Sequence, residues 1–327
     1  MLTFMKTFNK YSILLLLTCM ACTDEELDIP VFDVQIDTEN ALKVEDGIPV
    51  FEVGSSIMFN IQGTADMVTF FSGEPGMMYE HRDRTKIDGI PFLQFQTQME
   101  NGDMPPGFFH VLLSSDFEGF SKDRTTDAER IRNATWEDIT EQCDIPLTQT
   151  TQLSPKIDLS SYGNNPLYVA FRYDRPANRD WPRYQVRAFR VGNDADGITY
   201  DVMRTGNAGW TAFDFNARED EDPYLATGGS RPNRIWDFRN AASDDRISIG
   251  YDSDLASDDW AITAPIALTS ISPDLGLGIK AYNDDWLRNY QFIYNNPGTF
   301  TVSFVATNSA YANTKIVVKE MEIKIIE

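Results

Sequence analysis

The acidic residues that gather late in the chain are the first groups whose type and spacing could do chemistry. Asp252 and Asp254 are separated by one residue, and Asp258 and Asp259 follow shortly after them. Carboxylate oxygens are the hard ligands that calcium prefers. These four residues are therefore weak calcium candidates, because their spacing lacks the regular ligand order of an EF-hand loop. No other cofactor or metal is expected.

Paired carboxyl groups, roughly 5–10 Å apart, are also what glycoside hydrolysis needs. The chain has 50 acidic residues, so such pairs will arise by chance, and no motif singles one out. It has no Gly-x-Ser-x-Gly sequence and only two histidines, His81 and His110, which gives little base capacity for a nucleophile. We therefore expect no catalytic residues and no enzymatic activity, and a cryptic glycoside hydrolase is only a third hypothesis.

Aromatic side chains are the usual platforms for sugars, whose C–H faces stack on the rings while polar neighbours bond the hydroxyls. Trp181 and Trp236 lie in polar, loop-like stretches, and Tyr224 lies between them in the sequence. These three residues are the ligand-binding candidates, although each ring could instead cap a sheet edge. Trp136 and Trp260 stand in strand-like phrases and are expected in a core.

The N-terminus carries a secretion signal. Lys6 and Lys10 form a basic region, and the apolar run at 13–17 is too short for the roughly 20 residues that cross a bilayer. Residues 1–21 are therefore predicted to be a signal peptide.

Cys22 follows Ala21, a pair that resembles the lipobox of bacterial lipoproteins, and Cys19 after Thr18 is the competing site. The resemblance implies that the Cys22 thiol is diacylated and that a lipid anchor holds the protein on a membrane, which more than one acyl chain makes stable. The acidic tether at 22–30 resembles the export signal of lipoproteins sent to the outer face of the outer membrane in Bacteroidota. Outer-membrane localisation facing the cell exterior is the expectation.

Charge and cysteine content exclude other classes. The formal net charge of −22 repels phosphate backbones, so no nucleic-acid partner is expected. Cys143 is the third and last cysteine, and it stands alone far from the other two, which leaves no disulfide framework to assemble.

Alternation of apolar and polar residues dominates the rest of the chain, as expected for half-buried antiparallel strands. Turn signals separate the alternating runs, and only 127–135 has a weak helical pattern. The sequence therefore predicts an all-β protein of the sandwich class. The alternating runs are 57–61, 93–99, 167–173, 300–304 and 321–325.

The order of the runs indicates a domain inserted into another. The strands expected at 31–36, 56–62 and 67–71, with those at 299–326, resemble an immunoglobulin-like sandwich of the PKD type. This domain is predicted to comprise 31–107 plus 289–327. The segment 108–288 resembles a galactose-binding-like jelly roll.

Several phrases together resemble a family of Bacteroidota surface lipoproteins of unknown function, often linked to polysaccharide-utilisation loci. The phrases are 63–76, 113–117, 136–140, 169–173 and 297–306. The resemblance implies non-catalytic capture of a polysaccharide or oligosaccharide for a neighbouring outer-membrane importer complex. The alternative is a structural or adhesive lipoprotein whose partner is another protein.

Overall fold

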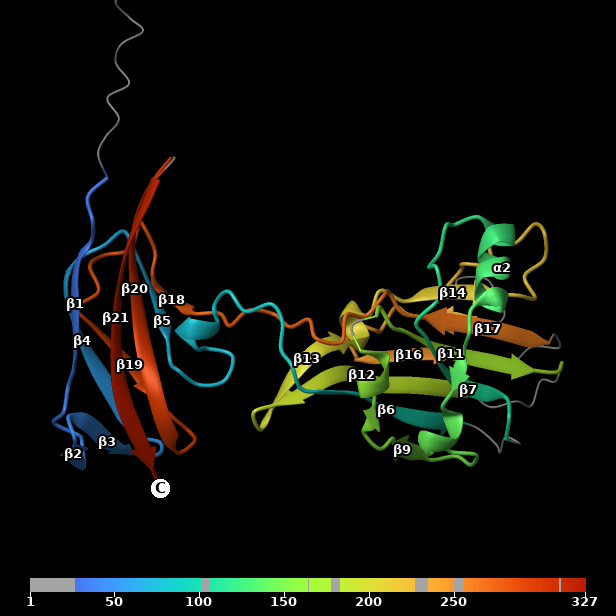
Figure 1. Ribbon diagram of the computed structural model, residues 1–327, viewed down its shortest axis with the longest axis horizontal. Helices are drawn as coiled ribbons and strands as arrows, with labels where there is room; N and C mark the ends of the chain where they lie inside the picture. The colour runs from blue at the N-terminus through green and yellow to red at the C-terminus, as the bar shows by residue number, and fades with distance from the viewer. Residues whose placement is uncertain are drawn as a thin grey trace, which may run out of the picture. The chain divides into compact units, whose positions relative to one another are not determined.

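The computed structural model describes residues 27–100, 106–163, 165–177, 183–226, 235–249, 256–311 and 313–327. The chain divides into two compact units (Figure 1). Unit 1 combines the residues up to 83 with Asp274–Glu327, and unit 2 is the intervening segment Arg84–Pro273.

Unit 1 contains two sheets, with strand orders β1-β4-β19 and β18-β5-β20-β21-β3-β2. Both ends of the chain contribute to the larger sheet, in which β20 pairs with β5 and β21 runs parallel to β3. A short 3-10 helix, η1, spans Tyr79–His81. The strands are β1 (Val31–Ile36), β2 (Lys43–Glu45), β3 (Ile48–Glu52), β4 (Ser56–Thr64), β5 (Met67–Phe71), β18 (Leu277–Lys280), β19 (Asn289–Ile293), β20 (Gly298–Ala310) and β21 (Asn313–Ile326).

The core of unit 1 is rich in phenylalanine. Phe59 from the smaller sheet packs against Phe70 and Phe304 of the larger one, with ring centroids 5.8 and 5.2 Å away. All three rings are fully buried. The apolar side chains that alternate along β4, β5 and β20 therefore fill the space between the two sheets.

Unit 2 also has two sheets. One follows the order β10-β6-β12-β16-β15, with β13 paired to β12 and β9 to β6, and the other is β14-β17-β11-β7-β8. The strands and helices are β6 (Ile90–Glu100), β7 (Phe109–Ser114), α2 (Arg124–Asn133), β8 (Glu137–Asp138), η2 (Thr140–Gln142), β9 (Thr151–Leu153), β10 (Ile157–Asp158), η3 (Ser160–Tyr162), β11 (Tyr168–Arg175), β12 (Arg183–Ala195), β13 (Ile198–Arg204), η4 (Thr205–Asn207), β14 (Thr211–Asp214), β15 (Trp236–Asp237), β16 (Arg246–Ile249) and β17 (Ser257–Ile262).

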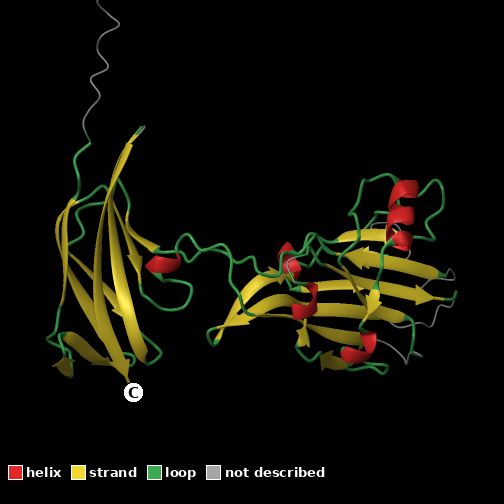
Figure 2. Cartoon of the chain, in the orientation of Figure 1, coloured by secondary structure: helices red, strands yellow, loops and turns green. Residues whose placement is uncertain are grey.

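The five-stranded sheet of unit 2 uses both of its faces. Its inner face packs on the seven-stranded sheet through fully buried side chains such as Val111, Val169 and Phe171. Its outer face is partly covered by α2, the only α-helix of the described residues, whose Ile131 packs over Ala170. Figure 2 shows this helix, with some shorter helical turns, in a unit made mostly of strands.

The all-β prediction is confirmed. The runs expected from alternation lie in strands, except that Leu167 forms an isolated bridge just before β11, and the expected helix at 127–135 corresponds to α2. Leu93, Phe95 and Met99, one face of the run at 93–99, are all buried. In the part of the chain that the structure describes, no helix is long and apolar enough to cross a bilayer.

The predicted domain boundaries differ from those of the structure. The predicted outer domain, 31–107 plus 289–327, includes β6, but this strand pairs along its length with β12 and belongs to unit 2. Residues 274–288, placed in the insertion, belong to unit 1, where β18 pairs with β5. Alternation reports that one face of a strand is buried, but it does not report which sheet the strand joins.

Gly63 tests the pairing of β1 with β4. Its φ is +98°, and a Cβ there would lie 1.8 Å from the carbonyl oxygen of Val31. Gly47 has a similar φ of +86° with no atom near its Cβ position. We expect Gly47→Ala to lower the free energy of unfolding by about 1–2 kcal/mol from backbone strain alone. Gly63→Ala should cost clearly more, roughly 3 kcal/mol or above, because the strand must also shift. Calorimetric unfolding of the full chain measures both, and equal losses would contradict the close approach.

Candidate functional site

A hollow of about 800 Å³ opens beside the N-terminal end of β7 in unit 2. β7, β8, η2 and the segment after η2 form its walls. Its lining mixes charged, amide, hydroxyl and apolar side chains: Pro106, Gly107, Phe109, His110, Asp138, Thr140, Glu141, Gln142, Asp144, Ile145, Leu147 and Tyr184.

The pleat of β7 places His110 on the outer face of the sheet. Its neighbours Phe109 and Val111 are buried in the core, so the intervening side chain points the other way. β8 pairs with β7 and brings Asp138 to the imidazole, with Nδ1 3.0 Å from the Asp138 Oδ2 atom. The backbone N–H of Val111 donates to Thr140 Oγ1 at 2.9 Å, which fixes the turn that follows β8.

Both ring nitrogens of His110 face acceptors. Nε2 lies 3.0 Å from the carbonyl oxygen of Gly107, and Nδ1 faces the Asp138 carboxylate. A neutral imidazole carries one N–H and can donate to one of these oxygens, whereas the imidazolium donates to both. The two oxygens therefore hold the ring from both sides.

Asp138 stays ionised because its partners outweigh its burial. Burial alone would raise the pKa of Asp138, but hydrogen bonds from Thr140 and the contact with His110 together hold that pKa below its usual value. Glu141 and Asp144 add two further exposed carboxylates to the walls. The hollow thus presents three acidic groups against one imidazole.

The floor and one side of the hollow are apolar. Tyr184 is fully buried, and its hydroxyl donates to the carbonyl oxygen of Pro146 at 2.7 Å. Ile145 is half-buried, and Leu147 leaves 41% of its surface exposed. Cys143, just beneath, is fully buried, and burial raises the pKa of its thiol to about 12. The thiol is therefore neither a nucleophile nor a metal ligand at neutral pH.

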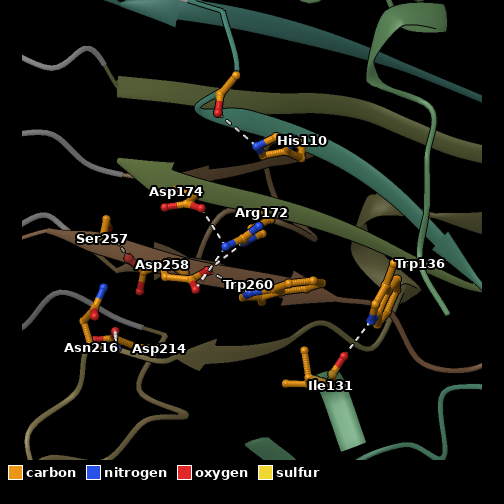
Figure 3. A network of polar contacts seen from close by, with 12 residues as sticks. His110, Ile131, Trp136, Arg172, Asp174, Asp214, Asn216, Ser257, Asp258 and Trp260 are labelled. Carbon is orange, nitrogen blue, oxygen red and sulfur yellow. Dashed lines mark hydrogen bonds and ion pairs between the residues drawn. The ribbon is translucent and has the colours of Figure 1, made fainter. Parts of the chain in front are cut away.

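A second polar group, the Arg172 network, lies next to His110 on the same sheet face (Figure 3). The Arg172 guanidinium bonds Asp258 through Nε at 2.8 Å and Nη2 at 3.2 Å, and Nη2 is 2.6 Å from Asp174. Its Cζ lies 5.4 Å from the ring centroid of Trp260. Burial would lower the pKa of Arg172, but the two carboxylates raise it, so the cation is held in place.

The outer face beyond this network is closed by an aromatic cluster beneath α2. The ring centroids of Trp136 and Trp260 are 5.2 Å apart, and the Trp136 indole N–H donates to the Ile131 carbonyl oxygen at 2.9 Å. Asp127 of α2 accepts bonds from the backbone of Ser121 at 2.7 Å and from the Tyr224 hydroxyl at 2.6 Å. These contacts fix the helix on the sheet.

The three aromatic candidates do not form one groove. The prediction that Trp236 is a platform is wrong. Its ring is 1% exposed and packs against Phe109 and Phe171 in the core. It occupies the two-residue strand β15, in which the ring is buried and the following Asp237 is half-buried. Tyr224 is half-buried on the other side of the five-stranded sheet, in the cluster beneath α2. Trp181 lies outside the described residues.

The core assignments of the other tryptophans differ from each other. Trp260 is buried, as expected, whereas Trp136 is only half-buried. Cys22 and Cys19 lie outside the described residues, so acylation remains a prediction.

The acidic candidates do not assemble into one calcium site. Asp258 and Asp259 are consecutive in β17 and therefore point to opposite faces of the sheet. Asp258 bonds Arg172, and Asp259 is buried beside the hydroxyl of Ser257. Asp252 and Asp254 lie outside the described residues. Within the described ranges, no group of three or more His, Cys, Asp or Glu side chains has a geometry that could hold a metal ion.

Sequence reasoning missed the pair of His110 and Asp138. Twenty-eight positions separate them, and only the pairing of β7 with β8 brings them together. A signal was present in the polar residue between Phe109 and Val111, which marks an outward position in a core strand.

Asp127 is the residue whose loss should most directly release α2. Asp127→Asn should lower the free energy of unfolding of unit 2 by roughly 3 kcal/mol, because several hydrogen bonds to a buried charge are weakened. The pKa of Asp127 is lowered: burial would raise it, but the bonds from Tyr224, Ser121 and Lys122 outweigh that effect. Its contribution is thus present above the ordinary carboxyl pKa and is lost as pH falls through the depressed one.

The measurement is denaturant unfolding of both proteins at neutral and acid pH, with Glu129→Gln, an exposed carboxylate on the same helix, as control. The difference between wild type and Asp127→Asn should shrink in acid. A difference that is constant with pH, or shared by Glu129→Gln, would contradict this role.

Comparison with known proteins gives a family. Residues 21–210 match the family described as "Domain of unknown function (DUF5017)", which is more than half of the 327-residue chain. The matched segment includes every residue that lines the hollow. No curated protein and no solved structure matches the chain. The chain therefore belongs to the family of DUF5017 domains.

Proposed function

We propose that this protein is a lipid-anchored bacterial surface protein that binds a polysaccharide or oligosaccharide in the hollow of unit 2, without catalysing its cleavage. The observation that carries the proposal is the hollow itself: about 800 Å³, open to solvent, with polar groups around an apolar side. This volume lies in the range of sites that hold small ligands.

The lining supplies what a sugar needs. Sugar hydroxyls donate hydrogen bonds, and the carboxylates of Asp138, Glu141 and Asp144 accept them. The exposed side chain of Leu147 and the neighbouring Ile145 offer apolar surface to the C–H faces of a sugar ring. In this proposal the sugar packs on aliphatic side chains and not on the tryptophan rings that the sequence predicts as platforms.

The cellular setting of the proposal rests on the sequence. Acylation of Cys22 tethers the mature chain to the outer membrane, facing the exterior. Unit 1 then serves as a PKD-like, immunoglobulin-like spacer and unit 2 as a jelly-roll binding module. Captured glycan passes to an importer complex in the same membrane.

A carboxylate in the hollow should matter for binding. Glu141→Ala should raise the Kd for the cognate glycan by roughly 5–20-fold, since a charge-assisted hydrogen bond is worth about 1–2 kcal/mol. Glu129→Ala, on α2 and away from the hollow, is the matched control and should leave the Kd unchanged. Affinity electrophoresis against plant and host glycans finds the ligand, and calorimetry measures the variants.

Failure of the folded protein to bind any glycan would overturn the proposal and favour a protein partner. Release of shorter products during the assay would instead identify a hydrolase.

The charge of the hollow should select among glycans. Three carboxylates face one imidazole, so a uronate or sulfate group would meet like charge, whereas neutral or amino sugars would not. We expect neutral polysaccharides to bind at least roughly tenfold more tightly than polyuronates of similar length, a difference of about 1.4 kcal/mol. Tighter binding of polyuronate, measured at the same ionic strength, would exclude the hollow as the site.

A further inference from the structure

One end of unit 1, called the tether end here, carries six exposed apolar or aromatic side chains. They are Ile29, Val31, Met67, Tyr282, Tyr311 and Ile316, with exposed fractions from 36% to complete exposure. Among the described residues, the exposed large hydrophobic side chains include two tyrosines, and both lie at this end.

The strand register brings these residues to the same end. Met67 of β5 lies opposite Thr307 of β20, and Thr307 lies opposite Ile316 of β21, so the three form one row across the sheet. Tyr311 follows directly at the tip of the β20–β21 hairpin. Tyr282 comes two residues after Lys280, whose ammonium donates to the carbonyl oxygen of Asp66 at 2.9 Å.

Hydrogen bonds fasten the start of the described chain to this hairpin. The Asn308 amide donates to the carbonyl oxygen of Asp28 at 3.0 Å and accepts from the backbone N–H of Asp66 at 3.0 Å. The N–H of Ser309 donates to the Asp66 carboxylate at 3.1 Å. Ile29 and Val31, which follow Asp28, are therefore held beside the hairpin.

The length of the tether limits how far this end can be from a membrane. Five residue steps separate Cys22 from Leu27, and a fully extended chain spans at most about 3.5 Å per residue, or roughly 17 Å in all. If Cys22 carries the acyl chains, the tether end is confined within that reach of the bilayer surface. The opposite end, marked by β2, is farther by about 26 Å, the length of β21 from Ile316 to Lys324.

The side chains match the surface that this constraint brings close. Tyrosine prefers the boundary between headgroups and acyl chains, where its ring is buried and its hydroxyl is solvated. Isoleucine, valine and methionine gain by leaving water at the same depth. Exposed apolar residues also occur singly on any protein, but six of the eleven that unit 1 has among the described residues lie at the end where the tether is attached. The other five are spread over the rest of the unit: Leu42, Val44, Leu275, Leu277 and Ile293.

We propose that the tether end of unit 1 rests on the lipid bilayer, with the β20–β21 hairpin tip inserted at the headgroup boundary. The occupant of this apolar surface is the lipid itself. The inference rests on the acylation of Cys22 proposed above. The anchor holds the chain on the membrane, and the hairpin contact fixes which end of unit 1 faces it.

A dye placed beside Tyr311 tests the contact. Ala310→Cys, exposed at the hairpin tip, is labelled with an environment-sensitive fluorophore in the full acylated chain, reconstituted in phosphatidylcholine vesicles. Cys143 is fully buried and stays unlabelled. We expect a blue shift and quenching of roughly half of the emission by headgroup nitroxide lipids, as for a group about 5–10 Å into the boundary. Val44→Cys, exposed at the opposite end, is the matched control and should show neither effect.

Adding Tyr311→Ser and Ile316→Ser to the Ala310→Cys reporter should remove most of the quenching. Vesicle flotation of the same samples separates the two proposals. Protein that floats while its label at 310 is quenched no more than the label at 44 overturns the contact and leaves the anchor intact. Protein that fails to float overturns the anchor, and the inference falls with it.

Discussion

The pleat of β11 decides which of its side chains face outward on the five-stranded sheet, to which β7 beside the hollow also belongs. Val169, Phe171 and Tyr173 are each fully buried against the seven-stranded sheet, so the residues between them must face outward. One of those is Ala170, small enough for α2 to cover, and the next is Arg172, which is too polar to be covered without partners. Alternation therefore places both Ala170 and Arg172 on the outer face, and the difference between their side chains sets where the part covered by α2 ends.

Electrostatics follow from that boundary. The chain has a net charge of −22, and its half-buried Arg172 guanidinium bonds the carboxylates of Asp258 and Asp174. His110 contacts a third carboxylate, that of Asp138. Glu141 and Asp144 in the hollow have no cation bonded to them among the described residues. The uncompensated negative charge thus lies in the hollow, beside a neighbouring face whose charges are paired. A ligand with many hydroxyl groups fits this distribution better than an anionic one.

Period-two alternation predicted the strands because it reports burial on one face, and burial is what fixes β4, β6, β11 and β20. It could not assign β6 to unit 2, because that depends on its partner β12, about ninety positions later. Composition around Trp236 misled for a related reason: the stretch is rich in polar residues, but Trp236 and the preceding Ile235 are both buried. His110 and Asp138 meet through strand pairing alone, and no local spacing encodes such a meeting.

The discontinuous course of the chain gives unit 2 two covalent connections to unit 1. They leave after residue 83 and return at residue 274, and the nearest strands on the two sides, β5 and β18, are hydrogen-bonded neighbours. A pull on unit 2, such as a bound polymer would exert, is therefore shared between two strands of the same sheet. β5 is in turn paired with β20, whose hairpin carries Tyr311 at its other end. The strands that flank the two connections to unit 2 and the β20–β21 hairpin therefore belong to one continuous hydrogen-bonded sheet.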